Sequence, residues 1–246
     1  MSDAAATSSP APAPARAEGG LARLAGVFIA PARTFASIAR RPTWLLPFAL
    51  AVGLAIPLTE IYMAKGDMRA EIVRGAEKKG QKLSDDQIEG ITSRMRSAAP
   101  LFDLFSIVVV GAVMFGTAGV LWASCQAFGW DVKFRQSIGV TTHAFLPSTL
   151  ASAILLGVLW NRESVDKATM GDALPVSLGR LPDARADPVG HSLLASVDVI
   201  SFWIMALLVL GLSAASGASR TRTAILVVSL WVLFVLGKAG LTAVFS

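Results

Sequence analysis

Five ionisable side chains stand inside long apolar segments of the sequence: Glu60, Asp103, His143, Asp198 and Lys238. A charge within a membrane is costly, so such residues are candidates for function. Histidine titrates near neutral pH and can move protons. Three carboxylates and one ammonium group at a similar depth could pair across helices or line a polar vestibule. The pattern therefore favours ion pairing or the passage of a small solute.

A less specific interpretation of the same residues stays open. Glu60 and Lys238 lie late in their segments, where a long side chain can reach water at the interface, and we favour this interpretation for both. For His143 we favour a hydrogen bond to a hydroxyl or carbonyl group of a neighbouring helix over proton transfer. His191, the second histidine, belongs to a distant loop.

Sequence templates for catalysis are missing. The chain has no Gly-x-Ser-x-Gly elbow, no His-Glu-x-x-His pair and no phosphate-binding loop that ends in Lys-Ser/Thr. Its single cysteine, Cys125, can form neither an internal disulfide nor a metal cluster, and we expect it to pack inside its helix. We therefore expect no enzyme activity, no cofactor and no metal site.

The apolar segments themselves define the fold class. Only 16% of the residues are charged and the mean hydropathy is +0.60, whereas soluble domains have about 25% charged residues. Five blocks are long enough to cross a bilayer, which takes about 20 helical residues. They cover residues 44–63, 101–128, 137–160, 194–214 and 223–245. The sequence predicts an all-α polytopic helical membrane protein with five transmembrane helices in one bundle over residues 44–246.

Prolines and tryptophans within these blocks add detail. Pro57 is expected to kink the first span, and Pro147 the third, because Pro147 deprives the His143 carbonyl of its helical donor. Trp203 lies inside the fourth span, so we interpret it as a packing residue. In the second span, small residues recur on one side, which favours close helix packing or, more specifically, self-association. These residues are Ala112, Gly116, Gly119 and Ala123.

The segments outside the spans differ in character. Residues 1–20 form an Ala/Pro-rich leader that we predict to be disordered. In residues 21–43, apolar residues recur at helical spacing beside basic ones, which predicts two amphipathic helices, the second opened by Pro31. They would lie on the membrane surface or pack on the protein's own loops.

The two long connections are predicted to differ. Residues 64–100 should form a helical hairpin at the outer face, because Ser84 and Gln87 have the spacing of a capping box; a flexible charged loop is the alternative. Residues 161–193, which contain three prolines, should be irregular and exposed.

Orientation is predicted from the short turns. Residues 129–136 and 215–222 are basic, and Arg40 and Arg41 precede the first span, so the N-terminus is expected to be cytoplasmic. The net charge of +5 is explained by these flanking residues. We expect contact with the lipid bilayer and no nucleic-acid binding, because no basic patch with interleaved aromatic residues is present.

Three motifs in this order resemble the Yip family, the five-span membrane proteins named after Ypt-interacting protein. The first is Pro31, Phe35, Ile38, Pro42, Trp44 and Pro47; the second is Gly129, Lys133, Phe134, Gln136, His143 and Pro147; the third is Asp198, Phe202, Trp203 and Gly211. The resemblance covers the chain from about Leu24 onward. It implies a cytosolic N-terminus and a helical bundle, and it favours a specific role for Asp198.

In the eukaryotic branch the resemblance also implies traffic factors that bind Rab-type GTPases and one another. The leader lacks an acidic, aromatic motif and Tyr62 is the only tyrosine, which argues against a GTPase partner and for the prokaryotic branch. We therefore expect a non-enzymatic protein of the bacterial inner membrane that acts through protein–protein or protein–lipid contacts in membrane organisation or trafficking. The alternative is a small transporter or channel-like protein that uses the intramembrane carboxylates and His143.

Overall fold

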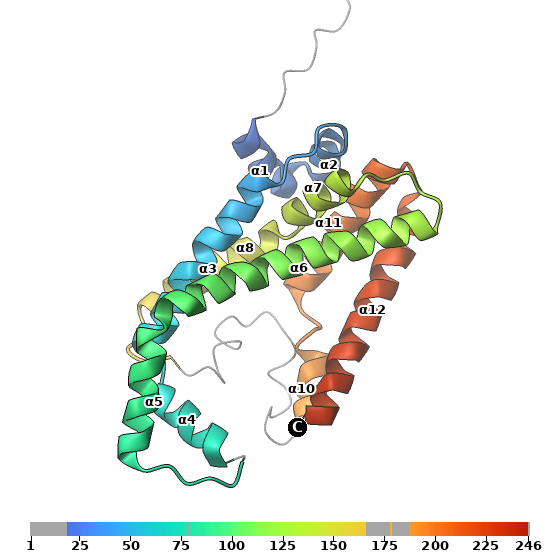
Figure 1. Ribbon diagram of the computed structural model, residues 1–246. Helices are drawn as coiled ribbons and strands as arrows, with labels where there is room; N and C mark the ends of the chain where they lie inside the picture. Colours follow the sequence, from blue (N-terminus) through green and yellow to red (C-terminus); the bar gives the residue numbers. More distant parts are fainter. Residues whose placement is uncertain (1–18, 78, 166–177, 179–186, 246) are drawn as a thin grey trace, which may run out of the picture.

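The computed structural model describes residues 19–77, 79–165, 178 and 187–245 (Figure 1). Helices dominate these residues, and no strand occurs among them apart from an isolated bridge between Gly66 and Val165. The helices are α1 (Gly20–Ile29), α2 (Pro31–Arg40), α3 (Leu45–Lys65), α4 (Met68–Glu77), α5 (Asp85–Ser97), α6 (Ala99–Ala127), α7 (Phe134–Ala144), α8 (Leu146–Trp160), α10 (Pro188–Leu194), α11 (Val199–Ser216) and α12 (Arg220–Phe245).

Five helical stretches are long and apolar enough to cross a membrane. They are α3, α6, the pair α7–α8 taken together, α11 and α12. Apolar side chains on α6 and α12, such as Phe105 and Phe234, are exposed, as expected for helix faces that meet lipid. The predicted all-α, five-helix membrane fold is thus confirmed.

The fourth span begins later than the sequence indicated. Residues 188–194 form α10, opened by Pro188 with the Asp187 carboxylate capping the Gly190 amide. The expectation of an irregular loop up to residue 193 was therefore wrong at its end. Most of that loop, and residues 1–18 of the predicted leader, lie outside the described residues. The helix of the fourth span starts at Val199, because the Asp198 side chain accepts from the Ser201 amide and caps it.

One end of the molecule is built around the junction of α2, α7 and α11. Phe35 and Ile38 of α2 and Val140 of α7 are fully buried there. A Cβ at Gly211 of α11 would lie 2.4 Å from Val140 Cγ1 and 2.8 Å from Phe35 Cδ1. Glycine is needed at this position because the three helices approach too closely for any side chain. We call this region the α2 end; α1 and α7 lie there too (Figure 1).

The third span is interrupted at Phe145, between α7 and α8. The break falls in the turn that Pro147 opens, as predicted from the lost donor to the His143 carbonyl. Its effect is to separate a buried segment from an exposed one. All but three of the residues of α7 are buried, whereas α8 exposes Leu150, Ile154 and Trp160.

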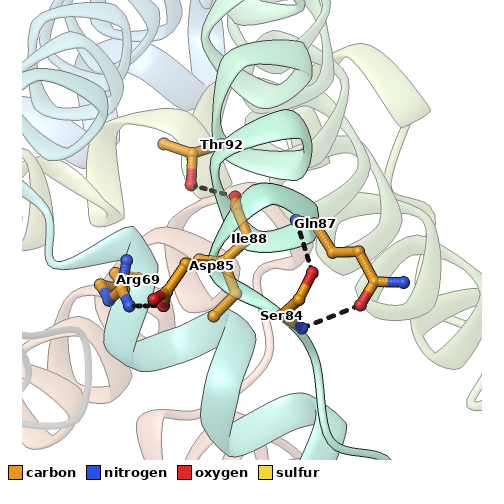
Figure 2. A network of polar contacts seen from close by, with 6 residues as sticks. All are labelled: Arg69, Ser84, Asp85, Gln87, Ile88 and Thr92. Atoms are coloured by element: carbon orange, nitrogen blue, oxygen red, sulfur yellow. Dashed lines mark hydrogen bonds and ion pairs between the residues drawn. The ribbon is translucent and has the colours of Figure 1, made fainter.

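The opposite end carries the predicted hairpin of α4 and α5, and we call it the α5 end (Figure 1). The capping box is present: the Gln87 amide donates to Ser84 Oγ at 3.3 Å, and the Ser84 amide to Gln87 Oε1 at 2.9 Å. Arg69 of α4 is ion-paired with Asp85 of α5 (Figure 2). Two helices that pack against each other, the second of them capped, therefore follow the first span.

Candidate functional site

Glu60 and Asp103 form the first of two polar pairs in the membrane helices. Glu60 lies late in α3 and Asp103 early in α6, and the two side chains are within hydrogen-bonding reach of each other. Asp103 Oδ1 is buried and has no hydrogen-bond partner among the described residues. The two carboxyl groups therefore meet between α3 and α6 near the α5 end.

Lys238 and Asp198 form the second pair. Lys238 Nζ of α12 donates to Ser196 Oγ at 2.5 Å, in the link between α10 and α11, and the Asp198 carboxylate at the end of that link attracts the ammonium group electrostatically. Asp198 Oδ2 also accepts from Ser201 Oγ at 2.5 Å. The carboxylate thus caps α11 and attracts the ammonium group of α12. Its position at the helix N-terminus suits a negative charge.

The four charged residues do not converge on one vestibule. Each interacts with a member of its own pair, and the pairs belong to different helix pairs, α3–α6 and α11–α12. Among the described residues, no group of three or more His, Cys, Asp or Glu could hold a metal ion. The attractive contact present among these residues is the hydrogen bond from Lys238 to Ser196, which ties α12 to the link between α10 and α11.

His143 is nearly fully buried on α7, with 1% of its surface exposed. Its Nδ1 lies 2.8 Å from the Gly139 carbonyl oxygen, one turn back on the same helix. The bond predicted to a neighbouring helix is therefore replaced by one within α7. A carbonyl oxygen can only accept, so Nδ1 carries the proton in this contact.

Two residues singled out for packing have clear contacts. Trp203 of α11 meets Phe28 of α1 edge to face, with ring centroids 5.4 Å apart. Cys125 of α6 is fully buried in the hydrophobic core of the protein, as expected. Pro147 is buried in the first turn of α8. The small-residue side of α6 behaves otherwise: a Cβ at Gly116 or Gly119 would meet nothing within 4 Å, so no described side chain packs closely against these two glycines.

The polar residue that sequence reasoning missed is Arg23. It was only one of several basic residues near the membrane, yet the structure buries it on α1, with 4% of its surface exposed. Its Nη1 donates to the Arg41 carbonyl at 2.9 Å and to Thr43 Oγ1 at 3.0 Å, and its Nη2 to Ser37 Oγ at 3.2 Å. The feature of the sequence that could have revealed its burial is that it is a single arginine among the apolar residues of a short helix.

These contacts define the class of protein as a polytopic helical membrane protein whose polar side chains, such as Arg23 and Lys238, link neighbouring helices and their connections. Comparison with known families then identifies its family. The family model described as the Yip1 domain matches residues 25–241, most of the chain, and the protein belongs to this family. No curated protein and no solved structure matches it significantly.

Proposed function

We propose that the protein is a non-enzymatic Yip-family membrane protein that acts through protein–protein or protein–lipid contacts at its α2 end, in membrane organisation or trafficking. The observation that carries this proposal is the architecture of that end. The amphipathic pair α1–α2 is fixed to the membrane helices through buried Phe35 and Ile38, while Arg40 and Arg41 remain exposed. A rigid basic platform beside a bilayer is suited to binding anionic groups of lipids or proteins.

The same end carries the other short basic segments. Lys133 and Arg135 precede and open α7, and Arg220 and Arg222 open α12. Under the positive-inside rule this concentration supports a cytoplasmic α2 end, hence a cytoplasmic N-terminus. We place the protein in the bacterial inner membrane on the ground that its leader lacks the acidic, aromatic motif of traffic factors that bind GTPases.

The transporter alternative gains no support from a specific contact. It was based on carboxylates and His143 acting together, but the charged residues interact in two separate pairs and His143 bonds within its own helix. The outward small-residue side of α6 is compatible with self-association, which would be a further protein–protein contact.

The proposal is tested by site-specific photo-crosslinking in the intact chain. A photoreactive residue at Ala32, exposed on α2, should trap a defined protein or lipid in the native membrane. The matched control is Glu89, exposed on α5 at the other end. Identical products from both positions, or none from Ala32, would contradict a contact function of the α2 end. Deleting α1 and α2 is a poorer test because it also removes buried Phe35 and Ile38.

A further inference from the structure

An open pocket of about 490 Å³ lies where α1, the end of α2 and the start of α7 meet. Four arginines from these three helices and their flanks line it, together with Gly20 and Thr43: Arg23, Arg40, Arg41 and Arg135. The lining contains no Asp or Glu. A cavity formed by four cations and no anion calls for a negatively charged occupant.

The contacts of Arg23 give the strongest indication that the pocket binds an anion. Its three hydrogen bonds go to a carbonyl and two hydroxyl groups, all of them uncharged. Its Nε is buried and has no hydrogen-bond partner, and no carboxylate oxygen lies within ion-pair distance among the described residues. A guanidinium has five N–H donors and is always charged, so burying it without an anion is costly. An anion in the pocket that Arg23 lines would compensate this charge.

The other arginines are available to the same anion. In the described part of the chain, the side chains of Arg40, Arg41 and Arg135 are exposed and make no hydrogen bond or ion pair. Arg135 stands in the first turn of α7, where the free amide groups of a helix N-terminus add positive potential. A cation is poorly placed there unless an anion lies beside it.

The surroundings of the pocket indicate what carries the anion. Thr43 in the lining is followed by Trp44 and then by exposed Leu45 and Leu46, which begin the first membrane helix. The start of α1 touches this apolar wall, since a Cβ at Gly20 would lie 2.9 Å from Leu46 Cδ2. The pocket is therefore within one helical turn of the apolar start of a membrane span, the level at which lipid headgroups lie.

We propose that this pocket binds the phosphate group of an anionic phospholipid, with the acyl chains against α3. Arginine pairs with phosphate oxygens through two parallel hydrogen bonds, and the four arginines of the lining, which come from three helices and their flanks, can bind a single phosphate together. The inference deepens the proposed function, on which it rests for the contact role of the α2 end, by naming the ligand class. It makes the arginine pocket the point at which a lipid would be held in place.

The test is a lipid titration of the purified full-length protein, followed by native mass spectrometry. The probes are phosphatidylglycerol and diacylglycerol with identical acyl chains, which differ in the phosphate-containing headgroup. The wild type should bind phosphatidylglycerol at least about tenfold more tightly than diacylglycerol, because each charge-assisted hydrogen bond is worth roughly a factor of ten. Equal binding of the two lipids would overturn the proposal.

Variants separate the pocket from general surface charge. The double variant Arg41→Gln with Arg135→Gln should lose this preference, and the Arg41 backbone carbonyl that receives Arg23 is kept. The matched control is Arg220→Gln with Arg222→Gln, which removes two exposed charges at the same end outside the pocket lining. An equal loss in both double variants would overturn the proposal. Should the first double variant misfold, Arg135→Gln alone serves, because its side chain bonds to no described residue.

A third arm distinguishes the source of the phosphate. Inorganic phosphate that bound with the same dependence on Arg41 and Arg135, without any binding of phosphatidylglycerol, would overturn the lipid assignment. These measurements use only purified protein with added lipid or inorganic phosphate. Their failure therefore leaves the crosslinking result at Ala32 intact, and the failure of that result leaves a measured lipid preference intact.

Discussion

The two ends of the molecule are both helical and both polar, but they are held together by different interactions. At the α2 end, Phe35 and Ile38 are fully buried. Gly211 lets α11 approach α7 and α2 so closely that no side chain would fit at its position. At the α5 end, the hairpin is joined by the ion pair of Arg69 and Asp85, whose side chains are 60% and 85% exposed. Packing across distant segments stabilises the first. The second combines local hydrogen bonds and charges with a smaller set of buried apolar side chains on α4 and α5, namely Met68, Ala76 and Ile88.

This difference shows where a rigid site can be built. Interior packing is dense and tolerates little change in volume, so the helices that carry the arginines of the α2 end are held at defined positions. Exposed caps and ion pairs contribute far less free energy. Substitutions at the two ends should therefore have effects of different size.

The largest effect is expected for Phe35→Ala. Removing a fully buried aromatic side chain at the helix junction should lower the free energy of unfolding by about 3–5 kcal/mol, from lost contacts and the cavity left behind. Denaturant titration in detergent micelles measures it. The matched control is Phe105→Ala, whose side chain is 65% exposed on α6. Similar losses for both variants would contradict the contrast between packed and lipid-facing surfaces.

Gly211→Ala should come next. The added methyl group would overlap Val140 and Phe35, and overpacking of this kind costs about 1–3 kcal/mol. The same titration should show no loss for Gly237→Ala on α12, where a Cβ meets nothing within 4 Å. A stable Gly211→Ala variant would mean that the three helices can separate without penalty.

Ser84→Ala should have a smaller and local effect. It removes the hydroxyl group that accepts from the Gln87 amide, a loss of about 1 kcal/mol for a helix N-cap. Hydrogen exchange should become faster in the first turn of α5 and stay unchanged in α7. Faster exchange at both ends would show that the hairpin is coupled to the α2 end.

The smallest effect is expected for Arg69→Gln. An exposed ion pair contributes roughly 0.2–1 kcal/mol and is screened by salt. The difference from wild type should therefore shrink when unfolding is repeated at high ionic strength. A loss as large as that of Gly211→Ala would place the Arg69–Asp85 pair among the main supports of the fold.

Features that depend on neighbouring residues in the chain were predicted from the sequence, whereas the partners of distant residues were not. The capping box of Ser84 and Gln87 and the helix break before Pro147 follow from chemistry within one or two turns of chain, and both were predicted. The partners of Asp103 and Lys238 depend on which helices are neighbours. A common depth in the membrane was visible in the sequence, but it does not determine whether four charges meet in one place or in two.

Hydrophobic run length alone determined that this is a five-helix membrane protein, because an apolar stretch of about 20 residues has few alternatives to spanning a bilayer. The three motifs placed it in the Yip family, which the match over residues 25–241 confirmed. Only the tertiary structure decided that Arg23 is buried and that Arg40, Arg41 and Arg135 gather around one pocket. These residues are up to 112 positions apart (135 − 23), and only the packing of α1 and α2 against α7 brings their side chains together.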